Sequence, residues 1–83
     1  MTRHRLANGQ TLTVGDRFGH IDCHGNMLLT YTVRGEDDGG VTVFDARCNR
    51  EYMPDHDLGG KRRFGATLVL IDDDNQPLPL PAG

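Results

Sequence analysis

Apolar and polar residues alternate over several short runs of the chain, and turn residues separate these runs. The first clear alternation covers residues 10–14, and it places Leu12 and Val14 on one face of an extended segment. Asn8-Gly9 precedes this run, and Asn-Gly between two extended segments is the strongest short-range signal of a two-residue type I′ hairpin. The pattern therefore predicts an N-terminal hairpin with Leu6 on the same inward face as Leu12.

A second and longer alternation covers residues 27–33, after a turn-rich segment at 22–26. It places four side chains on one face, those of Met27, Leu29, Tyr31 and Val33. Residues 34–40 contain three glycines and no apolar residue, which predicts a flexible hairpin loop at the surface. We expect residues 41–48 to form the next strand and to pair with 27–33.

The C-terminal half of the chain is less regular. Pro54 excludes a helix interior within residues 49–60, so this segment predicts a one-turn helix or an ordered loop. Residues 63–71 are the most β-prone run of the chain. The tail at 76–83 places prolines two residues apart, which predicts an extended or disordered end after a single domain over residues 1–75.

These segments together predict an all-β fold. Eleven glycines among 83 residues interrupt any helical period and suit short strands joined by tight turns. We expect a small antiparallel barrel or rolled sheet of five to six short strands. Apolar residues make up only 36% of the chain and tryptophan is absent, so the core should be thin. A chain this short gains stability from self-association or from a bound metal.

The strand and turn pattern also resembles a known family. Leu12-Thr13-Val14-Gly15-Asp16-Arg17-Phe18, a Gly-Asn turn, Tyr31-Thr32-Val33 and Val41-Thr42-Val43 follow one another as in small SH3-like barrel proteins of bacteria and their phages. The resemblance covers residues 10–48. It implies an SH3-like barrel and a phage or mobile-element origin, and it carries no functional residue to this chain.

Charge and cysteine content indicate where the protein works. The net charge is −3, and acidic residues cluster at 36–38 and 72–74, so the surface should be patchy. The basic start is not followed by an apolar stretch, so neither a signal peptide nor a membrane span is expected. The two cysteines are too few for a disulfide scaffold and are expected to be reduced thiols. We therefore expect a cytoplasmic protein.

A zinc site is one candidate chemistry, because imidazole and thiolate are the preferred ligands of tetrahedral Zn²⁺. The candidate ligands are His20, Cys23, Cys48 and His56. The spacing of the downstream pair does not match a zinc knuckle, and no CxxC is present. We therefore favour a buried cysteine and histidines on exposed turns over metal ligands. No cofactor is expected.

Enzymatic activity is not expected. The chain contains no serine, so it has no serine nucleophile, and no GxGxxG motif precedes a helix. Cys23 and His24 are neighbours along an extended segment and would point to opposite sides. A domain this small also rarely encloses a useful pocket.

A non-enzymatic module that binds a protein partner, a second copy of itself being the simplest one, is the favoured function. The candidate contact residues are Tyr52, Met53 and Phe64, since aromatic and Met side chains beside Arg are enriched in interface cores. Nucleic-acid binding is the alternative, because Lys61, Arg62, Arg63 and Phe64 combine phosphate-binding charges with a stacking ring.

Overall fold

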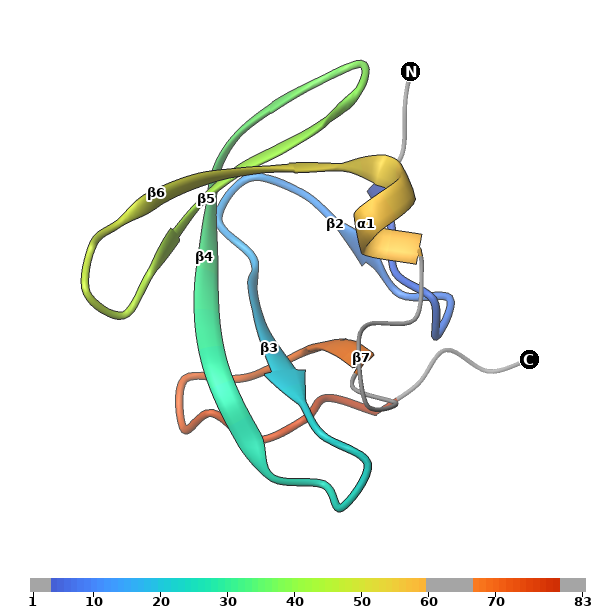
Figure 1. Cartoon of the computed structure of the whole chain (residues 1–83), viewed down its shortest axis with the longest axis vertical. Helices are drawn as coiled ribbons and strands as arrows, with labels where there is room; N and C mark the ends of the chain where they lie inside the picture. Colours follow the sequence, from blue (N-terminus) through green and yellow to red (C-terminus); the bar gives the residue numbers. More distant parts are fainter. Residues whose placement is uncertain (1–3, 60–66, 80–83) are drawn as a thin grey trace.

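The computed structural model describes residues 4–59 and 67–79, which form antiparallel strands and one short helix (Figure 1). The helix, α1 (Asp55–Gly59), lies between the last two strands in the chain. The strands are β1 (His4–Arg5), β2 (Thr11–Leu12), β3 (Arg17–Ile21), β4 (Met27–Asp37), β5 (Gly40–Asp45), β6 (Arg50–Pro54) and β7 (Thr67–Leu70). β1 and β2 form a two-stranded sheet, and the other five strands form a second sheet in the order β6-β5-β4-β3-β7.

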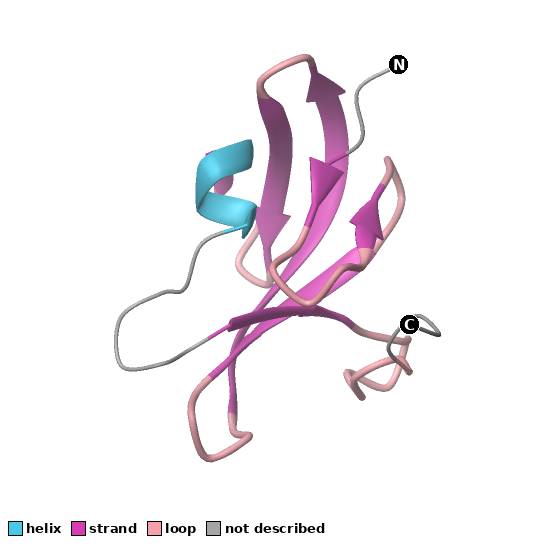
Figure 2. Ribbon diagram, turned by 90° about the vertical axis from the view of Figure 1, so that its right-hand side faces the viewer, coloured by secondary structure: helices cyan, strands magenta, loops and turns pink. Residues whose placement is uncertain are grey.

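The predicted all-β class is confirmed, and within the described residues the large sheet is open rather than closed into a barrel. Its edge strands are β6 and β7, and Figure 2 shows that it is strongly twisted, with α1 beside the strands. The strand β6 was not predicted from the sequence. Residues 50–54 show no clean alternation, and they become a strand because they continue a hairpin from β5, where Val41 pairs with Met53. The predicted one-turn helix follows directly at Asp55.

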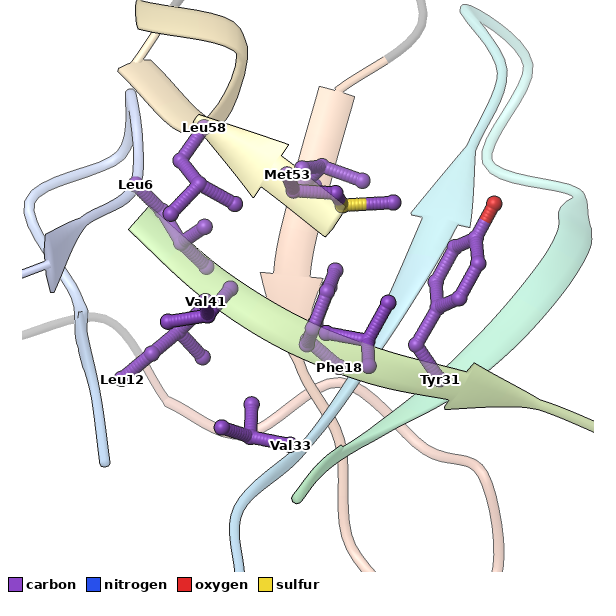
Figure 3. Close-up of a cluster of buried hydrophobic side chains, with 10 residues drawn as sticks. Leu6, Leu12, Phe18, Tyr31, Val33, Val41, Met53 and Leu58 are labelled. Carbon is purple, nitrogen blue, oxygen red and sulfur yellow. The ribbon is translucent and has the colours of Figure 1, made fainter. Parts of the chain in front are cut away.

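A small apolar core fills the space inside the curved sheets (Figure 3). Phe18 and Tyr31 are cross-strand partners on β3 and β4, and their rings stack with centroids 5.1 Å apart. Such an aromatic pair adds roughly 0.5–1.5 kcal/mol to the free energy gained by burying its surface. The other members of the main cluster are Leu6, Leu12, Val33, Val41, Val43, Met53, Leu58 and Leu68.

Two side chains predicted to face inward are exposed instead. Val14 is 54% exposed because β2 ends at Leu12, and the chain turns at Gly15, which has φ +99°. Leu29 is 48% exposed although it lies on the predicted strand. It falls on the part of β4 that extends past β5, beyond the reach of the core. Both residues follow the alternation of apolar and polar positions, but no other part of the described structure packs over their side chains.

The predicted flexible loop at 34–40 is wrong. β4 continues through this polar segment to Asp37, and β5 starts at Gly40, so only two residues form the turn. The Asp37 carboxylate accepts hydrogen bonds from the N–H groups of Gly39 at 2.8 Å and Gly40 at 3.0 Å. An acidic residue that is usually read as a loop former here organises a tight hairpin.

One backbone turn recurs four times in the described residues. In each case the N–H of the first residue donates to the carbonyl of the fifth, and the N–H of the fourth donates to the carbonyl of the first. The loops are Leu6–Gln10, Asp22–Asn26, Asp45–Asn49 and Asp72–Gln76. This is the three-residue hairpin loop, in which a left-handed residue follows a type I turn. The N-terminal hairpin is thus confirmed, whereas its predicted two-residue type I′ turn is wrong.

The fourth residue of each loop has a positive φ, and two of the four are not glycine. Gly9 and Gly25 adopt φ values of 91° and 84°, while Cys48 and Asn75 adopt 64° and 62°. Glycine takes this conformation without a steric penalty and asparagine tolerates it. Cysteine has neither advantage, so Cys48 is the strained member of the set.

Replacing Cys48 with glycine should stabilise the fold. The left-handed conformation costs an ordinary residue roughly 1–2 kcal/mol, and the greater freedom of glycine in the unfolded chain offsets about half of this gain. We therefore expect Cys48→Gly to raise the free energy of unfolding by roughly 0.5–1 kcal/mol in urea denaturation. Cys23→Gly is the matched control, because Cys23 is exposed in a loop of the same kind without a positive φ. An equal or larger gain from Cys23→Gly would contradict this explanation.

Gly40 is required by close packing between β5 and β6. A Cβ atom at this position would overlap the carbonyl oxygen of Met53 and lie 2.8 Å from the Cα atom of Pro54, both of them backbone atoms. We expect Gly40→Ala to lower the free energy of unfolding by about 2 kcal/mol or more. Gly35→Ala on the same hairpin is the control, since its nearest contact would be Thr42 Cβ at 3.8 Å. Similar denaturation midpoints for the two variants would contradict the prediction.

Candidate partner-binding groove

The two neighbours of β4 cover different lengths of it. β3 pairs with β4 as far as Met27, whereas β5 pairs with it only from Tyr31 to Asp37. In the described part of the chain, residues 27–30 therefore have a partner strand on the β3 side and none on the β5 side. This leaves a short length of exposed strand edge in the middle of the sheet order.

The backbone groups of Thr30 face this exposed edge. On the β3 side, the Val33 N–H donates to the Asp16 carbonyl, and the Gly15 N–H donates to the Val33 carbonyl, both at 2.9 Å. In an antiparallel strand, successive residues direct their N–H and C=O groups to opposite edges. Thr32 accordingly lies on the β5 side, where it is paired with Phe44. Thr30 follows two residues away on the same side, next to Tyr31, the last residue of β4 that is paired with β5.

A groove of about 680 Å³ lies along this edge. Its floor is the first part of β4, and its walls are the loops Asp45–Asn49 and Asp72–Gln76. Specific small-molecule and peptide sites commonly have volumes of roughly 300–1,000 Å³, so the groove is large enough to hold a ligand. The lining residues are Met27, Leu28, Leu29, Thr30, Asp45, Ala46, Arg47, Asn49, Asn75 and Gln76.

Two adjacent leucines give the floor of the groove its apolar surface. Leu28 is 53% exposed and Leu29 is 48% exposed. The ladder pairs His20 with Leu29 and Ile21 with Met27, so Leu28 is an extra residue in a β-bulge. The bulge breaks the strict alternation of faces, and both leucines line the groove. Adjacent exposed leucines beside an unpaired strand edge are typical of a surface that another chain covers.

Hydrogen bonds hold both walls of the groove in place. Asp45 Oδ1 accepts the N–H groups of Arg47 at 2.8 Å and Asn49 at 2.9 Å. In the other wall, Asp72 Oδ1 accepts the N–H groups of Asp74 at 2.9 Å and Gln76 at 3.0 Å. Arg17 on β3 reaches this second wall, donating to the Asp72 carbonyl at 2.8 Å and to Asn75 Oδ1 at 2.7 Å. The guanidinium therefore fixes the second wall to the strand next to β4.

One wall of the groove is acidic. The lining itself contains one aspartate, Asp45, and one arginine, Arg47, and the acidic run at 72–74 lies on the loop that contributes Asn75 and Gln76 to it. The two wall loops, together with the Arg17 side chain that holds one of them, contain four aspartates and two arginines, a net charge of −2. The charged residues are Asp45, Asp72, Asp73, Asp74, Arg17 and Arg47. The aspartates at 72–74 belong to the acidic run that the sequence placed at the surface. An acidic wall beside an apolar floor favours a ligand with positive charge.

The predicted contact residues Tyr52, Met53 and Phe64 do not form one exposed surface in the described structure. Met53 is 1% exposed and belongs to the core, so its assignment as a partner contact is wrong (Figure 3). It faces inward because it pairs with the buried Val41 on β5. Tyr52 is 47% exposed, and its hydroxyl donates to Asp37 at 2.8 Å. Phe64 lies outside the described residues.

The four candidate zinc ligands belong to different parts of the fold. His20 is on β3, Cys23 and Cys48 are exposed in separate hairpin loops, and His56 is on α1. Among residues 4–59 and 67–79, no group of three His, Cys, Asp or Glu side chains is arranged to hold a metal ion. The predicted basic cluster of Lys61, Arg62, Arg63 and Phe64 lies outside these ranges. None of the helices described there is long and apolar enough to cross a membrane.

A second polar cluster, not predicted from the sequence, surrounds His4 on β1. His4 is 1% exposed, and its Nδ1 and Nε2 atoms lie 2.7 Å from Asp55 Oδ1 and 3.5 Å from Glu36 Oε2. The neighbouring Tyr52 hydroxyl lowers the pKa of Asp37, and Asp37 in turn raises the pKa of Tyr52. The imidazole joins β1 to α1 and to the end of β4, and its near-complete burial makes it a structural contact rather than a ligand-binding one.

Two of the hairpin loops that begin with aspartate also make stability depend on pH. The Asn49 N–H, followed by the Arg47 N–H, lowers the pKa of Asp45 below 3.8, and the Asn26 N–H does the same for Asp22. A depressed pKa in the folded state contributes stability above the unfolded pKa, and this contribution is lost as pH falls through the folded value. We expect Asp45→Asn to lower the free energy of unfolding near neutral pH, with the difference shrinking below pH 3.8. Denaturation series across this range would test it, and a difference independent of pH would contradict it.

Comparisons with known proteins add nothing to the interpretation of this groove. No protein-family model matches the chain, and neither the curated proteins nor the solved structures contain a significant match. The SH3-like resemblance of residues 10–48 therefore stays a prediction. The interpretation of the groove rests on its own residues.

Proposed function

We propose that the protein is a non-enzymatic interaction module that binds a protein partner in the groove along β4. The observation that carries this proposal is the unpaired edge of residues 27–30 beside the exposed side chains of Leu28 and Leu29. Unpaired strand edges are templates for pairing with another chain, and proteins usually protect them with charge, bulges or a covering segment. Here the bulge leaves the leucines exposed in a groove large enough to receive a second chain.

The chemistry of the groove supports binding over catalysis. Asp45 is the carboxylate in the described part of its lining, and it accepts hydrogen bonds from three donors of Arg47 and Asn49. These hydrogen bonds lower the pKa of Asp45, so it is ionised and poorly suited to act as a general acid near neutral pH. Among the residues that the structure describes, the lining contains no His, Cys, Lys or Tyr side chain. The hydroxyl of Thr30 is thus without a histidine or lysine in this described lining to activate it as a nucleophile.

Charge favours a protein partner over nucleic acid at this groove. Proteins that hold a phosphate backbone present Lys and Arg to it, because each contact must offset a negative charge. The groove instead has one arginine and one aspartate around an apolar floor, and the loop of its second wall adds three further aspartates beside it. Phosphate groups would be repelled from the acidic wall loop, whereas a peptide would find both an apolar surface and the edge of a strand.

Leu28→Asp should weaken the partner complex. The substitution places a charge on the apolar floor without disturbing the core, because Leu28 is already half exposed. We expect a partner captured from the cells that encode this chain, once purified, to bind Leu28→Asp with a Kd at least about tenfold higher, a loss of about 1.4 kcal/mol. Isothermal titration calorimetry would measure it, with unfolding midpoints confirming that each variant is folded.

Val14→Asp is the matched control, because Val14 is 54% exposed and does not line the groove. It should retain the same partner with the affinity of the wild type. Two outcomes would contradict the proposal. In one, Leu28→Asp binds the partner as tightly as the wild type does, and in the other, the wild type captures no partner protein.

A further inference from the structure

From the shape and charge of the groove we infer that the bound segment is an extended peptide with alternating apolar and basic side chains, which adds to β4 as a strand at residues 27–30. This inference rests on the proposed function and specifies the partner of the same site. Three observations carry it: the edge of residues 27–30 that no β5 residue pairs with, the adjacent leucines and the acidic wall loop at 72–76.

The added strand would occupy the position in the sheet that β5 leaves empty. β5 pairs with β4 down to Tyr31, where Asp45 begins the loop that turns back to β6. Beyond that loop the edge of β4 continues for four residues, from Met27 to Thr30. Four residues of strand span about 13 Å. The edge is therefore long enough for a short peptide to form a ladder, with the backbone of Thr30 at the end nearest β5.

The side chains of such a peptide would meet two different surfaces. In a strand, alternate side chains point to opposite faces, so one set can cover Leu28 and Leu29 while the other set points away from them. The backbone hydrogen bonds supply affinity in this mode of recognition, and alternate side-chain contacts supply specificity. Apolar peptide residues at every second position would therefore pack against the leucines on the floor of the groove.

The charges on the walls select the charge of the remaining peptide side chains. Asp73 and Asp74 are exposed on the loop beside the groove, and Asp72 and Asp45 add their charges to the walls. Arg17 is held by the Asp72 carbonyl and Asn75, which leaves Arg47 as the exposed cation of the lining. Lysine or arginine at the alternate positions of the peptide complements this field, and aspartate or glutamate is repelled.

Two matched heptapeptide libraries test the inference. In the first, Val, Ile, Leu and Phe alternate with Lys and Arg, and in the second, Asp and Glu replace the basic residues. We expect the wild-type protein to retain the basic library in preference, with retention falling as salt concentration rises. Leu28→Asp should lose this retention and Val14→Asp should keep it. Asp73→Asn combined with Asp74→Asn should reduce the preference for basic peptides, and Asp57→Asn on α1 is the charge control.

Backbone pairing has its own readout. N-methylation of the best peptide at positions of one parity should abolish binding, while methylation at the other parity should leave it, because only alternate N–H groups face β4. Hydrogen exchange of the Thr30 amide should slow in the complex. Equal retention of both libraries, or indifference to the parity of methylation, would contradict the inference.

The failure of this inference is distinguishable from failure of the proposed function. If a purified partner depends on Leu28 while neither library is retained, the groove binds protein but not by adding a basic strand. If the wild type dimerises in analytical ultracentrifugation, Leu28→Asp is monomeric and no peptide is retained, the edge belongs to a second copy of the chain, and the basic-peptide inference is wrong.

Discussion

Backbone hydrogen bonding along β4 is the interaction on which the rest of the structure depends. This strand is 11 residues long and lies in the middle of the large sheet, whereas β5 beside it has six residues. The half of β4 that pairs on both sides contributes Tyr31 and Val33 to the core. The half that pairs on one side lies outside the core and forms the floor of the groove. A difference in strand length thus separates the stabilising part of the sheet from the part available for binding.

The repeated three-residue loop accounts for much of the topology. An aspartate at the first position satisfies two backbone N–H groups within its own loop, at 22–26, 45–49 and 72–76. Because the loops are satisfied internally, they need no support from a large core. This suits a chain with few apolar residues. Two of the loops then become the walls of the groove.

The sequence predicted those parts of the fold whose determinants are local. Alternation placed Leu12, Tyr31 and Val33 correctly in the core, and Asn8-Gly9 located the first hairpin. The errors arose where a distant segment decides the outcome. Val14 and Leu29 alternate correctly but have no layer above them, and Met53 is buried only because β6 pairs with β5. The length of a neighbouring strand cannot be read from local periodicity.

The groove was missed for the same reason, although one signal for it was present. Leu28 and Leu29 are consecutive, and a strand with one buried face cannot place two successive side chains in the same core. Reading this pair as a sign of an exposed apolar surface would have located the floor. The missing length of β5, which creates the free edge, depends on where the Asp45 loop begins, and only the three-dimensional pairing shows it.

The contact of Arg17 with the 72–76 loop has a consequence for the entropy of association. The guanidinium ties one wall to β3, and β3 is paired with the same strand that forms the floor. Wall and floor therefore move as one unit, and the recess exists before any ligand arrives. A preorganised recess of this kind loses little conformational freedom on association, so even a short interface retains more of its contact energy as affinity.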